Sequence, residues 1–257
     1  MSSNFNNKLD ILKVKIKNIT KIITDKVDKI PAGYVFTYSE IIDDTDKAEA
    51  IIKSLNRMVV SGKLKKISKG RFYKPEKTPF GELEPSEYQV AKDLLEKDNK
   101  VIGYLTGLSI YNKLGLTTQI SNTIQIGRNN IRPSLIRGKY KISFILQKNT
   151  INKKNIPFLQ LIDAIKYFKK IPASDVDFII NRFKTLLLEL SNKQLKMLIK
   201  LLMQYPANTR ALTGALIDEI GKKNFTEEIK SSLNPITSYK LEIPKEILST
   251  KINWNIK

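Results

Sequence analysis

The chain has 257 residues, with 45 Lys and Arg against 25 Asp and Glu, a formal net charge of +20, and neither histidine nor cysteine. The missing cysteine excludes disulfides, thiol nucleophiles and thiolate metal sites, and the missing histidine excludes catalysis by an imidazole base. The length predicts one large domain or two small ones, with enough apolar residues for folded cores. The charge indicates a polyanionic partner, with nucleic acid ahead of an anionic membrane.

The first predicted element is a long amphipathic helix over residues 9–30. Apolar residues recur there at intervals of three and four, which places them on one helical face. Pro31 and Gly33 are typical of a helix end. A short extended segment is expected next, at residues 34–37.

Two capping-box patterns, at 37–40 and 46–49, predict the starts of a short helix and of a longer second helix. Gly62 stands where a glycine commonly follows a helix. Residues 63–74 then combine apolar and basic positions around a Gly-containing turn, which favours a hairpin. We expect four aromatic side chains of this region to close its small core: Tyr34, Phe36, Phe72 and Tyr73.

The predicted elements follow the order of a winged helix-turn-helix: a long helix, a short helix, a turn, a second helix and a basic hairpin. Ile51, Leu55 and Val59 would seat the second helix on the first two, leaving its other side to enter a DNA major groove. The hairpin would lie beside it, close to phosphates or a minor groove. The predicted DNA-binding residues are Lys47, Lys53, Ser54, Arg57, Lys63, Lys65, Lys66, Lys69, Arg71 and Lys74.

The distribution of charge favours DNA binding. Between Lys53 and Lys77 there are nine basic residues and one acid, Glu76, whereas the segment just before is acidic. A general compositional bias toward lysine would not sort the charges in this way. Two alternatives stay open: winged helices also serve as protein–protein modules, and lysine-rich hairpins can be solvated sheet edges.

Proline and glycine at four positions between residues 75 and 85 predict a linker. The expected organisation is a DNA-binding domain at 1–76, a linker at 77–85 and a C-terminal domain at 86–257. That domain is expected to be mixed α/β to about residue 172 and helical beyond, so the fold class is α+β. Its predicted elements are helices at 86–97, 106–113 and 157–170, strands at 122–126 and 140–146, and helices at 175–190, 192–205 and 206–220.

Several segments together resemble the AbiEi-type antitoxins of type IV toxin–antitoxin systems, over about residues 10–172. The block Gly103-Tyr-Leu-Thr-Gly107 narrows the resemblance more than the N-terminal part, which many winged helices share. The segments that carry it are 33–41, 55–63, 67–75, 80–86, 103–117 and 123–126.

The resemblance implies a bacterial or phage-associated, DNA-binding transcriptional autorepressor that binds inverted repeats in its own promoter. It also implies an antitoxin role for the C-terminal domain and a nucleotidyltransferase-like toxin as functional partner, without a required stable complex. Two alternatives remain: a module that binds a toxin or other protein directly, and a DNA-binding regulator unrelated to such systems.

A second basic stretch follows the linker. From Asn99 to Ile162 the chain has no Asp or Glu. This stretch is a candidate second surface for DNA, RNA or toxin, or alternatively a solvated basic region with no ligand. The residues proposed for it are Arg128, Arg132, Arg137, Lys139 and Lys141.

The sequence does not favour catalysis. Gly107-Leu-Ser109 superficially resembles the entry to a nucleotidyltransferase site, but the acid-free stretch supplies no carboxylates to hold divalent metal. Asp175 and Asp177 are better explained as the acidic start of a helix. We therefore predict no enzyme activity, no cofactor and no metal site. With no apolar leader or membrane-length segment, the predicted location is the cytoplasm.

Overall fold

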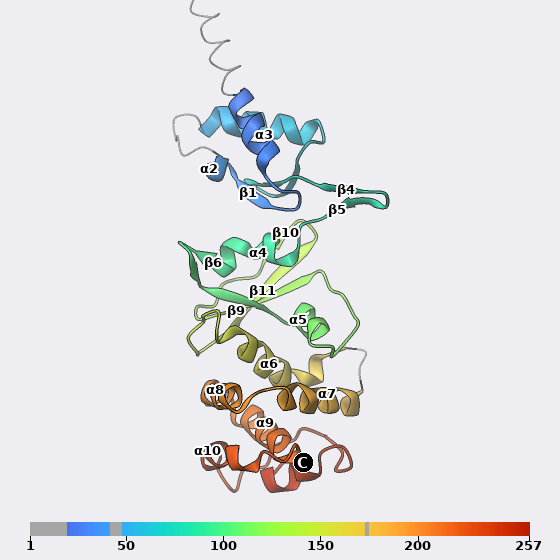
Figure 1. The fold of residues 1–257 in the computed structure, drawn as a ribbon, viewed down its shortest axis with the longest axis vertical. Helices are drawn as coiled ribbons and strands as arrows, with labels where there is room; N and C mark the ends of the chain where they lie inside the picture. Colours follow the sequence, from blue (N-terminus) through green and yellow to red (C-terminus); the bar gives the residue numbers. More distant parts are fainter. Residues whose placement is uncertain (1–19, 42–47, 173–174) are drawn as a thin grey trace, which may run out of the picture. The chain divides into compact units, whose positions relative to one another are not determined.

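The structure, a computed structural model, describes residues 20–41, 48–172 and 175–257 (Figure 1). It divides into two compact units, each with a hydrophobic core of its own. The first unit runs to Lys92 and includes residues 137–139, and the second comprises residues 93–136 and 140–257. The mixed α and β composition expected from the sequence is confirmed.

The first unit contains its elements in the order expected from the sequence. A helix over residues 20–29 is the described part of the predicted long helix, whose earlier residues lie outside the described chain. The second predicted capping box also falls largely outside it. The elements that follow are β1 (Val35–Thr37), α2 (Tyr38–Ile41), α3 (Ala48–Val60), β2 (Lys65–Ser68) and β3 (Arg71–Tyr73).

Local interactions set the ends of these elements. Gly33 has a φ of 75°, a left-handed conformation that suits glycine, and its N–H donates to the carbonyl of Lys74 at 2.8 Å. The Glu40 carboxylate accepts from the N–H of Thr37 at 3.0 Å, which is one half of the predicted capping box. The Thr37 hydroxyl donates to the same carboxylate instead of accepting from a backbone amide.

A three-stranded antiparallel sheet in the order β1-β3-β2 lies against the helices of the first unit. Its core is apolar, with the rings of Phe36 and Phe72 6.2 Å apart between centroids. Phe36, Phe72 and Tyr73 are buried as predicted, and Tyr34 packs at the edge of the core. The buried residues of this core are Ile23, Val27, Phe36, Ile41, Ile51, Leu55, Met58, Leu64 and Phe72.

The predicted linker contains regular structure. Strands β4 (Glu76–Thr78) and β5 (Gly81–Leu83) form a hairpin, because Pro79 and Phe80 make the turn and Gly81 takes a φ of 118°. An ion pair of 2.6 Å between Lys65 and Glu82 attaches this hairpin to β2. The proline and glycine pattern therefore marked a turn, and the boundary between the units lies later, after Lys92.

Helix α4 (Glu87–Leu95) begins in the first unit. The amide of Gln89 donates to the Ser86 hydroxyl at 3.3 Å, in line with the predicted cap. The side chain of Gln89 accepts from the N–H of Val35 on β1, and Lys92 donates to the Tyr34 hydroxyl. These contacts explain why the start of α4 belongs with the first unit.

The second unit is built on a four-stranded sheet in the order β10-β11-β9-β8. Strands β9 (Thr123–Arg128) and β11 (Tyr140–Leu146), both predicted, pair in parallel, and β9 pairs antiparallel with β8 (Gly103–Thr106). Strand β10 (Leu135–Arg137) lies beside β11. A small hairpin of β6 (Glu96–Lys97) and β7 (Lys100–Val101) comes between α4 and β8.

Helices cover this sheet and extend the core beyond it. Figure 1 shows α6 next to the sheet and α8, α9 and α10 stacked further from it. The predicted helices of this region are confirmed within a few residues at each end. They are α5 (Leu108–Lys113), α6 (Ile156–Lys166) with η2 (Phe168–Lys170), α7 (Val176–Leu188), α8 (Asn192–Leu202) and α9 (Ala207–Glu219). Three short helices that the sequence did not predict follow them: η3 (Lys223–Phe225), α10 (Glu227–Ser231) and η4 (Ser249–Trp254).

A buried carboxylate joins the sheet to the helices of the second unit. Asp163 on α6 accepts from Tyr104 at 2.7 Å and Thr106 at 3.1 Å, both on β8, and from Tyr205 at 2.8 Å. Gln147 donates to both tyrosine hydroxyls at 2.8 Å. Burial raises the pKa of Asp163 to about 6, although the hydrogen bonds from Tyr104, Tyr205 and Thr106 lower it.

We predict that Asp163 makes the stability of the protein depend on pH. Its pKa is raised above the ordinary 3.8, so its contribution is fully present below that value and is lost as the pH rises through about 6. The expected loss is up to about 3 kcal/mol in the free energy of unfolding. Urea unfolding between pH 4 and pH 7 should show this component in the wild type and not in Asp163→Asn.

Asp177→Asn, which removes an exposed carboxylate from α7, is the matched control and should retain the pH dependence of the wild type. A difference between the wild type and Asp163→Asn that does not change with pH would contradict the assignment.

Candidate nucleic-acid interface

Helix α3 has one buried and one exposed face. Ile51, Ser54, Leu55 and Met58 are buried, at a spacing that places them together against the core. The exposed positions are spaced by three and one along the same helix, so they form a continuous opposite face. This exposed α3 face consists of Glu49, Ile52, Lys53, Asn56, Arg57 and Val60.

Two of the four residues predicted to contact DNA from the second helix lie on this exposed face. Arg57 is exposed. Lys53 is also exposed, and its ammonium lies 2.6 Å from the carboxylate of Glu49, one helical turn earlier. The hydrogen bond and the charge of Lys53 hold the pKa of Glu49 below its ordinary value. Lys47 lies outside the described residues.

The prediction for Ser54 was wrong. Its side chain is 4% exposed and lies on the buried face, where its hydroxyl has no hydrogen-bond partner within the described chain. The predicted buried face of the helix ran through Ile51, Leu55 and Val59. The observed buried face is rotated slightly around the helix axis, so it includes Ser54 and Met58. A serine at that angle on the helix points into the core.

The hairpin of β2 and β3 carries the second group of predicted contacts. Lys69 and Gly70 form its turn, and Gly70 takes a φ of 74°. Lys66 is exposed, with its ammonium 5.8 Å from the centroid of the Phe72 ring. Arg71 is half-buried at the start of β3.

Three further predicted contacts are held by groups of the first unit. The ammonium of Lys63 lies 2.7 Å from the Asp28 carboxylate, and Lys74 donates to the backbone carbonyl of Asp28 at 3.0 Å. Lys65 pairs with Glu82, and the hydrogen bond and charge of that carboxylate raise the pKa of Lys65. Arg57, Lys66 and Lys69 are thus exposed without an ion pair to any residue in the described part of the chain.

The predicted second basic surface includes a structural arginine. Arg137 is 5% exposed, and its guanidinium donates to the backbone carbonyl of Val90 at 2.7 Å. A buried guanidinium cannot contact a polyanion, so its assignment to a surface was wrong. Lys139 pairs with Glu84 at 2.8 Å, and both residues belong to the first unit.

The remaining members of that group lie in the second unit. Lys141 and Arg132 are exposed, and Arg128 is half-buried. Burial and the charge of Arg132 lower the pKa of the Arg128 guanidinium. The sequence grouped these five residues because they are close along the chain, whereas the structure distributes them over two units.

Two apolar side chains on the exposed α3 face were not singled out from the sequence. Val60 is 90% exposed and Ile52 is 38% exposed. The helical spacing alone would have placed Val60 beside Arg57, three residues later, and Ile52 at the other edge of the same face. Apolar groups of this kind contact thymine methyl groups in a major groove, and they also contact protein partners.

The described residues contain no group of three or more acidic side chains placed to hold a metal ion. In the same residues, no helix has the length and apolar character needed to cross a membrane.

Comparison with solved structures shows the class of fold. The crystal structure of the RV2827C protein from Mycobacterium tuberculosis superimposes with a TM-score of 0.57, covering 85% of this chain and 82% of that one. At 13% sequence identity, this similarity concerns the fold alone. None of the curated proteins matches the chain.

The model of a family of unknown function, DUF6088, matches residues 22–195, which is more than half of the chain. The protein belongs to this family.

We predict that Ser54→Ala stabilises the protein without changing the exposed α3 face. Removing a buried hydroxyl that has no partner should raise the free energy of unfolding by about 1 kcal/mol. Chemical unfolding monitored by circular dichroism checks this. Ser61→Ala is a suitable control, because the Ser61 hydroxyl donates to the carbonyl of Met58 at 3.1 Å and its loss should not stabilise. A destabilised Ser54→Ala variant would restore a role for the hydroxyl.

Proposed function

We propose that the first unit is a winged helix-turn-helix that binds double-stranded DNA, with α3 as the recognition helix and the β2–β3 hairpin as the wing. The observation that carries the proposal is the exposed α3 face with Arg57, together with a hairpin that presents Lys66 and Lys69. A helix with an accessible polar face fits a major groove, and a basic hairpin beside it can contact phosphates.

The structure of the first unit supports distinct roles for these residues. Arg57 is the candidate for a base contact, because an arginine can donate two hydrogen bonds to guanine in the major groove. Lys69, in the hairpin turn, is the candidate for a phosphate contact that carries no sequence information. Lys53, Lys63 and Lys65 are already paired with carboxylates, so they would contribute by exchanging one partner for another.

We further propose that the protein is a transcriptional autorepressor and an antitoxin of a type IV toxin–antitoxin system. The support is the sequence resemblance to AbiEi-type antitoxins, most specific in the Gly103–Gly107 block. In the structure, Tyr104 and Thr106 of that block donate hydrogen bonds to Asp163, which is a structural role within the second unit. The proposed partners are inverted repeats in its own promoter and a nucleotidyltransferase-like toxin in the cytoplasm.

A protein-interaction role is the second candidate. Val60, nearly fully exposed at the end of α3, and Ile52 on the same face would suit an apolar contact with another protein. Size-exclusion chromatography with light scattering, with and without a nucleotidyltransferase-like toxin, distinguishes this role. A stable complex lost in Val60→Ser would favour protein recognition by this face.

We predict that substitutions of Arg57 and Lys69 affect DNA binding in different ways. Arg57→Ala should lose about 1–3 kcal/mol of preference for the promoter over a random duplex, because it removes a base contact. Lys69→Ala should weaken binding to both duplexes and reduce the dependence of affinity on salt by about one counterion. Fluorescence anisotropy over a range of salt concentrations measures both effects.

Lys196→Ala, which removes an exposed charge from α8 in the second unit, is the matched control and should bind both duplexes as the wild type does. If Arg57→Ala and Lys69→Ala weaken binding to the two duplexes equally, the assignment of roles is wrong. If neither variant differs from Lys196→Ala, this face is not the DNA interface.

A further inference from the structure

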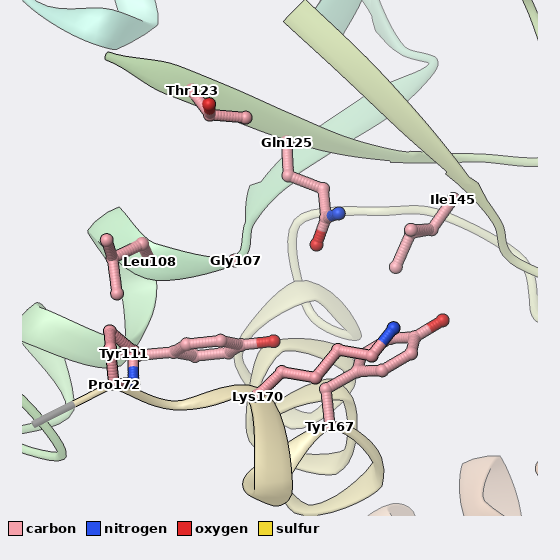
Figure 2. A pocket seen from close by; sticks show the side chains of 9 residues that line it. All are labelled: Gly107, Leu108, Tyr111, Thr123, Gln125, Ile145, Tyr167, Lys170 and Pro172. Atoms are coloured by element: carbon pink, nitrogen blue, oxygen red, sulfur yellow. The ribbon is translucent and has the colours of Figure 1, made fainter. Parts of the chain in front are cut away.

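The second unit contains a cavity of about 290 Å³ (Figure 2). It lies between the start of α5, the strands β9 and β11, and the segment that follows α6. Its walls combine apolar side chains, such as Ile145, with polar ones. None of the side chains that line it in the described chain is acidic.

Five polar side chains line this cavity: Thr123, and the four considered for ligand binding, Tyr111, Gln125, Tyr167 and Lys170. Figure 2 shows the Gln125 amide and the Tyr111 hydroxyl pointing into the space between them, with Lys170 and Tyr167 along its edge. The Lys170 ammonium lies 5.2 Å from the centroid of the Tyr167 ring. Within the described residues, none of these four side chains hydrogen-bonds to another group.

The absence of a side chain at Gly107 leaves room for the Gln125 side chain. Gly107 has a φ of 76°, and a Cβ atom there would lie 2.9 Å from the Cβ and 3.1 Å from the side-chain oxygen of Gln125. Only glycine leaves this space free, because both the backbone conformation and the close approach exclude a larger residue. The position of the Gln125 side chain therefore depends on a glycine of the Gly103–Gly107 block.

Burial fixes the chemical state of Tyr111. Its side chain is buried, and burial raises the pKa of its hydroxyl, with further contributions from Asp163 and Tyr167. Tyr111 thus remains a neutral hydroxyl that can both donate and accept a hydrogen bond. Lys170, in contrast, is exposed at the edge and supplies a positive charge that solvent can reach.

These groups match the chemistry of a nucleotide. A glutamine amide presents a donor and an acceptor side by side, as a base edge does, and aromatic rings offer a surface on which a flat base can lie. An exposed ammonium at the edge suits a phosphate. The cavity volume lies just below the usual range for ligand cavities, roughly 300–1,000 Å³, which limits the ligand to a single nucleotide.

We propose that this cavity binds a nucleoside 5′-monophosphate, with the base against Gln125 and Tyr111 and the phosphate at Lys170. The site lies wholly in the second unit, shares no residue with the proposed DNA interface, and goes beyond the proposed function. Gln125 and the tyrosine hydroxyls recognise the base, and Lys170 distinguishes a nucleotide from a nucleoside.

Isothermal titration calorimetry on the full chain, without DNA, tests the proposal. The ligands are AMP, GMP, CMP and UMP, the four corresponding nucleosides, and inorganic phosphate. We expect saturable binding of at least one nucleotide with a Kd below about 1 mM. The matching nucleoside should bind at least about tenfold more weakly, since it lacks the contact with Lys170.

Variants locate the site. Lys170→Gln should weaken the nucleotide about tenfold and leave the nucleoside unchanged, whereas Gln125→Leu should weaken both about tenfold. Lys153→Gln, which removes an exposed charge elsewhere in the second unit, is the control and should bind as the wild type does. Circular dichroism melting verifies that each variant folds. If Gln125→Leu does not fold, Lys170→Gln still tests the proposal, through the ratio of nucleotide to nucleoside affinity.

The proposal is overturned if no nucleotide binds saturably up to about 10 mM. It is equally overturned if Lys170→Gln and Lys153→Gln have the same affinity, or if inorganic phosphate binds as tightly as the nucleotides. DNA binding is measured in separate titrations without nucleotide, so a failure here leaves the proposed function untouched, and a failure there leaves this site untouched.

Discussion

The arrangement of the second unit depends on one buried carboxylate. Removing an ionised group from water costs several kcal/mol unless other groups hydrogen-bond to it, and three hydroxyls donate to Asp163. They come from β8 and from the residues after α8, so satisfying the charge fixes the sheet, α6 and the following helices together. Gly127 belongs to the same constraint, because a Cβ atom there would lie 2.3 Å from the ring of Tyr104. The strand that carries Tyr104 and Thr106 leads directly into Gly107 and the cavity.

In the first unit, the cations differ in how firmly the protein holds them. Lys53 and Lys65 form exposed ion pairs, which contribute little to stability and are screened by salt. A phosphate can therefore replace the carboxylate at little cost, and the pairing does not exclude these lysines from an interface. Arg137 differs from these lysines, because its guanidinium is buried and donates to a backbone carbonyl, a hydrogen bond that would be lost if the side chain turned to a ligand.

The sequence predicted the elements of the chain better than the positions of individual polar residues. Periodicity was sufficient for α3, for β11 and for the helices after residue 175, since an apolar stripe is a local property. The predictions for Ser54 and Arg137 were wrong, because their polar character suggested exposed side chains and both are buried. Periodicity also gave no indication of the role of Asp163, which ends the acid-free stretch but gains its partners from β8 and from Tyr205, after α8. Such contacts depend on the pairing of β8 with β9 and on the packing of α6 against the sheet, which no local pattern encodes.

The net charge of +20 says less about function than the position and the partners of each basic side chain in the structure. A fold shared at 13% identity conserves the shape of a core and says little about which surface side chains bind a ligand. Among the accessible cations, those to which a role is proposed are Arg57, Lys66 and Lys69 in the first unit, and Lys170 at the edge of the cavity. The first three lie on local elements, so the sequence could propose them. Lys170 acquires its role only through Gly107 and Gln125, which the sheet brings to the same cavity from distant parts of the chain.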